Sequence, residues 1–163
     1  MERYYRLNLP RKVVNLLVRP LVHFGIVLRH TYVLSVAGRK TGRCYSTPVT
    51  LVEDGERWLV APYGERSWVK NARAAGWVEL SRGGRSERVQ VTEVAPEEAG
   101  PVLQAYVRSV PSTRRFFTAA ASAPTADFVA EAHRHPVFRI APYAGAASAT
   151  AATAVPLRPG SAP

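Results

Sequence analysis

The sequence has little cysteine and no long apolar run. One cysteine, Cys44, among 163 residues excludes an internal disulfide. No apolar run reaches the roughly 20 residues that a membrane-spanning helix needs. Charged residues stand near the start of the chain where a secretory signal would need a cleavable apolar segment. We therefore expect a cytoplasmic protein.

The motifs of several well-defined site types are also missing. The chain contains no GxxxxGK[ST], GxGxxG, HExxH or paired CxxC sequence. No motif therefore supports a P-loop protein, a dinucleotide-binding fold or a zinc site. No GxSxG elbow surrounds any serine, and Cys44 is as consistent with a strand or turn residue as with a reactive thiol. His133 and His135 form an HxH pair that no further ligand motif accompanies, and we expect no metal site.

Acidic residues are scarce relative to basic ones. The chain has 22 Lys and Arg against 12 Asp and Glu, a net charge of +10. This excess favours an anionic partner, although only 3 of the 22 are Lys, so 22 − 3 = 19 are Arg, which is typical of a GC-rich genome. A nucleic-acid-binding module fits the charge, but no helix-turn-helix, finger or RNP-like pattern accompanies it. We expect no specific nucleic acid partner.

Residues 1–30 carry six basic side chains against one acid. Apolar residues fall largely at helical spacing from Pro10 to Leu28, with Pro20 and Gly25 interrupting, so the spacing predicts one kinked helix or two short ones. Two interpretations stay open. The segment docks on the core of its own domain, or it covers a pocket and touches the inner face of a membrane through residues 1–28.

From residue 31 the pattern changes to short β-branched and aromatic runs that predict strands. Asp54-Gly55 and Gly83-Gly84 tolerate positive φ and therefore close hairpins, which favours antiparallel pairing. The expected strands are Thr31–Ala37, Tyr45–Glu53, Arg57–Pro62, Trp77–Ser81, Arg85–Val94 and Val137–Ile140, and the expected helices are Arg66–Ala75, Glu97–Val110, Ser112–Ala121 and Thr125–His133.

These patterns divide the chain into three parts. Residues 1–30 are the basic helical segment, residues 31–143 form one α+β domain, and residues 144–163 form a tail rich in small residues and proline. The tail cannot bury enough apolar surface to offset the entropy of ordering it, so we expect it to be disordered.

The most informative stretch is the glycine-flanked basic turn at residues 38–43. Arg39, Lys40 and Arg43 supply positive charge and Thr41 a hydroxyl, while the glycines let backbone N–H groups face outward. Such a turn can receive a phosphate or carboxylate. The alternative is a solvated hairpin whose charges serve solubility.

The run VLSVAGRKTGRCYSTPVTLVEDGERWLVAPYG, followed by SWVKNARAAG, resembles the deazaflavin-dependent nitroreductase family of actinobacteria. The resemblance extends from about Asn15 to Ile140, where the HPVFRI strand closes the pattern. It implies an antiparallel split β-barrel, related to the FMN-binding barrels, with an N-terminal helix and flanking helices.

The resemblance also implies a function. Family members bind coenzyme F420, a 5-deazaflavin with a phosphate and an oligoglutamate tail, and pass a hydride from its reduced form to quinones, nitro compounds or other electron-poor acceptors. FMN is the less favoured alternative cofactor. Carried over by position, the cofactor-binding residues are Arg39, Lys40, Thr41, Gly42 and Arg43 in the turn, Thr47 and Pro48 beside it, Ala61, Pro62, Tyr63 and Gly64 at the ring, and Trp68 and Asn71 on the helix.

The chain departs from the family pattern at two places. Tyr45 stands where several relatives have an Arg, which Arg43 could replace, and Tyr63-Gly64 stands where some have Ser-Lys. An acceptor that gains a hydride also needs a proton, and Tyr63 or Tyr45 are our candidate catalytic donors, with solvent as the alternative.

The main alternative function is a non-catalytic carrier on the same barrel that binds a fatty acid, a flavin or haem. Fold alone does not separate it from a reductase. A homodimer is one oligomeric state that the related barrels suggest. The identity of the acceptor stays open.

Overall fold

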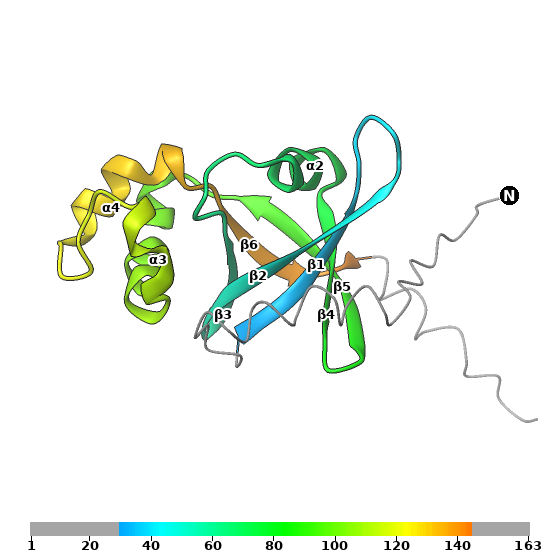
Figure 1. The fold of residues 1–163 in the computed structure, drawn as a ribbon, viewed down its shortest axis with the longest axis horizontal. Helices are drawn as coiled ribbons and strands as arrows, with labels where there is room; N and C mark the ends of the chain where they lie inside the picture. Colours follow the sequence, from blue (N-terminus) through cyan, green and yellow to red (C-terminus); the bar gives the residue numbers. More distant parts are fainter. Residues whose placement is uncertain (1–29, 145–163) are drawn as a thin grey trace, which may run out of the picture.

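Six strands close into one antiparallel barrel in the computed structural model, which describes residues 30–144 (Figure 1). The order around the barrel is β1-β2-β3-β6-β5-β4. The strands are β1 (Thr31–Ala37), β2 (Cys44–Asp54), β3 (Glu56–Val60), β4 (Trp77–Arg82), β5 (Arg85–Glu93) and β6 (Val137–Pro142). This arrangement confirms the predicted α+β fold with an antiparallel barrel. The expected N-terminal helix and the expected disordered tail fall on residues outside the described range, apart from the two at its ends.

Tight hairpins join β2 to β3 and β4 to β5, as the two glycine dipeptides predict. Asp54 pairs with Glu56 across Gly55, whose φ is 71°. Arg82 pairs with Arg85 across two glycines that also have positive φ. Only glycine adopts this backbone conformation at little cost, so these residues fix the strand registers.

The barrel interior is filled by side chains that alternate along each strand. The largest of those that are fully buried there include Leu34, Leu59, Leu80 and Phe138. Burying each such side chain contributes roughly 1.5–3 kcal/mol. The barrel is therefore a packed core, and a ligand of any size has to bind outside it.

Helix α2 (Ser67–Ala75) crosses one end of the barrel (Figure 1) and ends at Gly76. Its buried residues Val69 and Ala72 join the barrel core. The amphipathic pattern predicted this helix with its first residue displaced by one.

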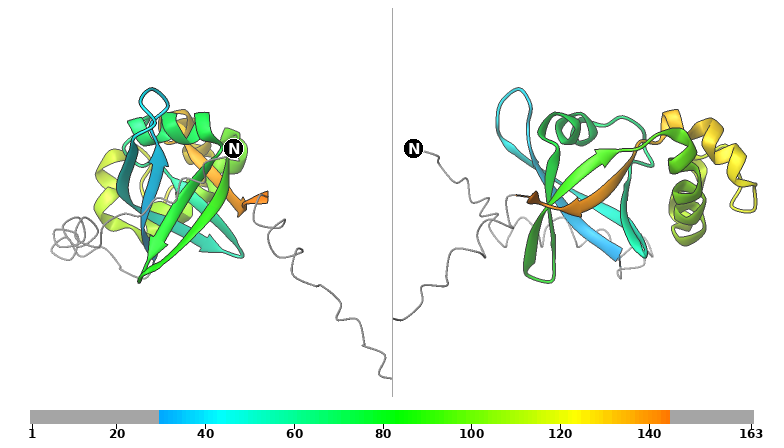
Figure 2. Two further views of the ribbon diagram at one scale, coloured as in Figure 1. Left: turned by 90° about the vertical axis from the view of Figure 1, so that its right-hand side faces the viewer. Right: turned by 180° about the vertical axis from the view of Figure 1, so that it is seen from behind.

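The remaining helical segments form a second layer beside the barrel (Figure 2). They pack around a separate apolar core that includes Leu103, Val107 and Phe128, together with Trp58 and Val60 from β3. The segments are α3 (Pro96–Ser109), η2 (Pro111–Phe116), α4 (Thr125–Glu131) and η3 (Ala132–Arg134). Among the described residues, none of the helices is both long enough and apolar enough to cross a membrane.

The helix expected over Ser112–Ala121 is wrong. A short 3₁₀ turn ends at Phe116, and the backbone N–H groups of Thr118 and Ala119 then donate to the Glu131 carboxylate at 2.9 and 3.0 Å. These donors are satisfied by a distant side chain instead of by carbonyls of a continuing helix, which sequence periodicity cannot reveal.

We predict that Gly100→Ala destabilises the domain. A Cβ at position 100 of α3 would lie 2.4 Å from the Val129 side chain of α4. The cost of this overlap, about 1–3 kcal/mol, exceeds the gain of up to about 1 kcal/mol in helix propensity. Chemical denaturation should show the double variant Gly100→Ala/Val129→Ala to be more stable than Gly100→Ala alone. Equal stability of Gly100→Ala and the wild type would contradict this close packing.

Candidate functional site

A cavity of about 490 Å³ lies where the barrel meets the helical layer. Its walls come from β2, from the loop between β3 and α2, and from α3 with η2. The volume lies within the range of about 300–1,000 Å³ that is usual for small-molecule sites. The lining residues are Thr31, Tyr45, Ser46, Thr47, Pro48, Val49, Thr50, Val60, Pro62, Tyr63, Arg66, Ser67, Trp68, Tyr106, Val110, Ser112 and Thr113.

The β2 wall is one continuous stretch of strand. Six consecutive residues, Tyr45 to Thr50, line the cavity, so it follows β2 for about 17 Å. Pro48 and Val49 on this wall and Trp68 and Val110 opposite are apolar, while hydroxyl groups are spread along the same surface. The cavity therefore suits a long ligand with a planar apolar part and a few polar atoms.

Of the residues predicted for the site, six line this cavity: Tyr45, Thr47, Pro48, Pro62, Tyr63 and Trp68. Tyr63 is 51% exposed, and its ring stands edge-on to Phe116 with centroids 4.7 Å apart. Tyr45 is 50% exposed and lies over Gly38, where a Cβ would come within 2.6 Å of the Tyr45 ring. A glycine at position 38 is thus needed for Tyr45 to lie at the end of the cavity.

The basic turn lies just beyond this end of the cavity. Arg39, Lys40, Thr41, Gly42 and Arg43 do not line it, but the turn leads directly into Tyr45. The turn is closed by backbone bonds from the Gly38 N–H to the Arg43 carbonyl at 2.7 Å and from the Gly42 N–H to the Gly38 carbonyl at 2.8 Å. Within residues 30–144, Lys40 and Arg43 form no ion pair.

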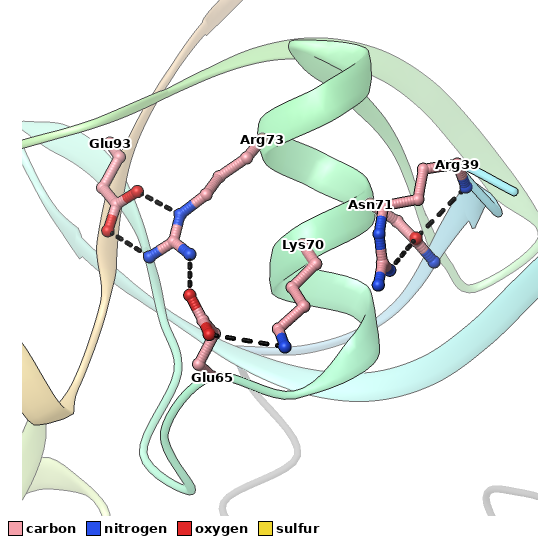
Figure 3. A network of polar contacts seen from close by, with 6 residues as sticks. All are labelled: Arg39, Glu65, Lys70, Asn71, Arg73 and Glu93. Atoms are coloured by element: carbon pink, nitrogen blue, oxygen red, sulfur yellow. Dashed lines mark hydrogen bonds and ion pairs between the residues drawn. The ribbon is translucent and has the colours of Figure 1, made fainter.

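Asn71 has a different place from the one that the resemblance implies. Its side chain is buried, and its Oδ1 accepts hydrogen bonds from the Arg39 backbone N–H at 3.2 Å and from the Arg39 guanidinium at 3.0 Å (Figure 3). The amide therefore fastens the basic turn to α2, and Arg39 is already partly engaged by the protein itself.

Helix α2 is fixed in turn by a network of charges (Figure 3). Arg73 binds Glu93 of β5 at 2.5 and 2.8 Å and also pairs with Glu65, which Lys70 approaches at 3.5 Å. The hydrogen bonds to Glu93 raise the pKa of Arg73, with Glu65 acting in the same direction. This network positions the loop and helix that form the second wall.

Two other predicted residues shape that wall from behind. Ala61 is buried in the barrel core, and its N–H donates to the Pro136 carbonyl at 2.9 Å. Gly64 lies so close to the Arg134 carbonyl that a Cβ there would be 3.3 Å away. Neither residue lines the cavity, and both hold the course of the backbone between Val60 and Arg66.

The predicted site residues include none of the third wall and only part of the other two, since Ser46, Val49 and Thr50 of β2 were not predicted either. Arg66, Ser67, Tyr106, Val110, Ser112 and Thr113 all line the cavity without having been predicted. Arg66 and Ser67 carried a usable signal, because they begin the predicted helix beside Trp68. Tyr106 and Thr113 carried none, since only the packing of α3 beside the barrel brings them to β2.

Buried His135 supports the Pro62 side of the cavity. It is 3% exposed, its Nδ1 lies 3.0 Å from the Pro62 carbonyl, and its ring stacks on Phe117. A carbonyl only accepts, so Nδ1 carries the proton. Burial lowers the pKa of His135, against the opposing effects of Glu131 and the Pro62 carbonyl. In the described part of the chain, no group of three or more metal-ligating side chains comes together.

The barrel and its lateral cavity define a small antiparallel-barrel protein with a ligand-sized site on the outside of β2. Residues 11–123 match the family model of the F420H(2)-dependent quinone reductases. The chain therefore belongs to the F420H(2)-dependent quinone reductase family. This confirms the predicted enzyme class, an oxidoreductase, and coenzyme F420 as its cofactor, and it disfavours a non-catalytic carrier.

Three solved structures are similar to this chain. A domain-swapped dimer covers 82% of this chain and 100% of its own at 18% identity, with a TM-score of 0.50. An F420-H2-dependent reductase, FDR-A, covers 69% and 95% at 17% identity, with a TM-score of 0.49. A 5-nitroimidazole antibiotic resistance protein from Bacteroides thetaiotaomicron covers 72% and 75% at 14% identity, with a TM-score of 0.47. No curated protein matches this chain.

We predict that His135 makes the domain less stable in acid. The unfolded chain has a histidine pKa near 6.5, and the folded pKa lies below it. As the pH falls below about 6.5, the unfolded state takes up a proton before the folded state does, so the free energy of unfolding decreases. Denaturation curves between pH 7.5 and 5 should show a weaker pH dependence for His135→Gln. The matched control is His133→Gln, which removes an exposed neighbouring imidazole and should change the slope less than His135→Gln does. An unaltered slope in His135→Gln would contradict the assignment.

Proposed function

We propose that the cavity holds the deazaflavin ring of coenzyme F420 along β2, with the phosphate and glutamate tail directed to the basic turn, and that the acceptor is a quinone. The observation that carries this proposal is the course of the cavity. It starts at Tyr45, next to the turn, and continues along β2 to Thr50. A ligand with an anionic end beside the basic turn and a planar end along β2 would match this arrangement.

The residues present fit the coenzyme on physical grounds. Pro48, Val49 and Trp68 offer an apolar surface to a planar ring, and the cavity volume suits one. Lys40 and Arg43 offer two cations that no described carboxylate neutralises. When bound, the reduced coenzyme supplies the hydride, so the protein needs to provide binding, orientation and electrostatics.

The part of the cavity near Tyr63 is the proposed place for the acceptor. Tyr63 lines the cavity from the loop after β3, with its ring against Phe116. Productive transfer requires reacting atoms about 3–3.5 Å apart and little water between them. We keep Tyr63 and Tyr45 as candidate hydroxyl donors, with water as the alternative proton source. A homodimer and a cytoplasmic location also stay predictions.

The contribution of the cations of the turn to F420 binding can be measured directly. We predict that Lys40→Ala/Arg43→Ala weakens the binding of oxidised F420 by about 10- to 100-fold, because two charge-assisted contacts are lost. Quenching of tryptophan fluorescence gives the Kd, and raising the salt concentration should narrow the difference. The control Arg85→Ala removes an exposed cation from the β4–β5 hairpin and should bind F420 as the wild type does.

Oxidation of F420H2 by a water-soluble quinone, followed by absorbance, tests the reaction itself. An unchanged Kd in the double variant would remove the turn from the site. Tighter binding of FMN than of F420 would overturn the ring assignment.

Peripheral membrane contact through residues 1–28 is a separate proposal. These residues lie outside the described range, and their basic and apolar composition is its support. We predict that deleting residues 1–28 lowers co-sedimentation with vesicles containing anionic lipid and slows turnover of a lipid-soluble quinone more than that of a water-soluble one. Unchanged vesicle binding and turnover in the deletion variant would refute the contact.

A further inference from the structure

We propose that Tyr106 is a catalytic residue that donates a hydrogen bond to the acceptor oxygen as negative charge develops on it. The proposal deepens the proposed function, because it assigns a residue to the same cavity. Tyr106 lies on α3, in a wall for which no residue was predicted, and lines the cavity.

The position of Tyr106 combines burial with access to the ligand. The residue is only 3% exposed, and its ring packs in the helical core 6.4 Å from the ring of Phe117. It nevertheless lines the cavity. The phenol therefore lies at a protected surface that a bound ligand, and little bulk water, would reach.

Thr113 lies beside the phenol on the same wall of the cavity. Its hydroxyl is close enough to that of Tyr106 to lower the Tyr106 pKa, against the larger effect of burial. The same Thr113 hydroxyl donates to the Val110 carbonyl at 2.8 Å, and Thr113 is itself buried. Because its proton is used there, the Thr113 oxygen can accept from Tyr106, or Tyr106 can donate to a ligand. A ligand oxygen would replace the Thr113 oxygen as the acceptor, so the phenol is oriented before the ligand arrives.

The other phenols at the cavity are less suited to this role. Tyr63 and Tyr45 are about half exposed, so water competes for their hydroxyl groups. A hydrogen bond to a developing oxyanion is stronger in a buried, low-dielectric place than at the surface. Burial, assisted by the nearby Tyr63, raises the pKa of Tyr106 well above its usual range. Tyr106 therefore stays protonated and acts as a donor.

The chemistry balances without any further reactant. A quinone that takes up a hydride gains two electrons and one hydrogen and becomes a hydroquinone monoanion. The Tyr106 O–H donates a hydrogen bond to the anionic oxygen and keeps its proton. One proton from water then completes the hydroquinone. Tyr106 stabilises the charge, and water remains the net proton source.

Packing alone does not require this hydroxyl. A phenylalanine would fill nearly the same volume in the helical core, and burying a hydroxyl costs free energy unless it is well bonded. Tyr106→Phe therefore removes the hydroxyl with little change in shape and isolates its contribution.

The test uses an oxyanion probe, so that it has a readout besides turnover. The protein is saturated with oxidised F420 and titrated with p-nitrophenolate, and with p-nitroanisole as the neutral analogue. We expect Tyr106→Phe to weaken p-nitrophenolate binding about 10- to 100-fold, to leave p-nitroanisole binding and the Kd of F420 unchanged, and to lower kcat with a quinone by a similar factor. Tyr143→Phe, a tyrosine outside the cavity beside Trp77, is the matched control and should change none of these values.

The outcomes distinguish a failure of the Tyr106 role from a failure of F420 binding. Equal loss of both probes would indicate a merely structural role, and unchanged p-nitrophenolate binding would also overturn the proposal. Failure of the wild type to bind F420 would instead overturn the proposed function. If Tyr106→Phe does not fold, Thr113→Val carries the test. It removes the partner that orients the phenol and should weaken p-nitrophenolate selectively, by a smaller factor, and the absence of any such loss would refute the role.

Discussion

The pairing of β3 with β6 is the contact on which the site depends. Val60 pairs with Val137 at the end of the ladder, and the contact continues beyond it through the Ala61 N–H to the Pro136 carbonyl and through His135 to the Pro62 carbonyl. One strand, β3, comes from the first half of the chain and the other, β6, from near the end of the described range. Their union closes the barrel and, in the same step, fixes the backbone of the loop that forms one wall of the cavity.

Closing the barrel in this way forces the helical layer to one side. Residues 96–134 connect β5 to β6, two strands that are themselves neighbours, so the whole segment has to leave the barrel and return to it. Trp58 and Val60 of β3 face that segment, while Leu59 between them faces the barrel core. The cavity lies between these two cores. The side chains of neither core fill it, so a ligand can enter.

The sequence predicted the strands well because the residues that begin and end them lie in or next to the strands themselves. β1 begins and ends where its β-branched run does, and glycines with positive φ close the two hairpins. Contacts between distant residues left no such signal. The Glu131 carboxylate takes the N–H groups of Thr118 and Ala119 and so ends a predicted helix, and Asn71 is occupied with Arg39. In the sequence, Tyr106 occupies an apolar position of an amphipathic helix, which predicts only that it is buried. The packing of α3 beside the barrel is what brings it to the cavity.

The positive charge of the chain has to be interpreted through the same contacts. Some of the basic side chains are paired within the fold, since Arg57 pairs with Glu87, Arg73 with Glu65 and Glu93, and Arg139 with Glu98. Isolated surface pairs of this kind add little stability, but they use up carboxylates that could otherwise neutralise cations elsewhere. Lys40 and Arg43 remain without such a partner in the described part of the chain, at the end of the cavity where an anionic coenzyme tail would leave it. The total of +10 therefore says little about the ligand, and what favours the turn as an anion site is that its two unpaired cations lie close to one end of the cavity.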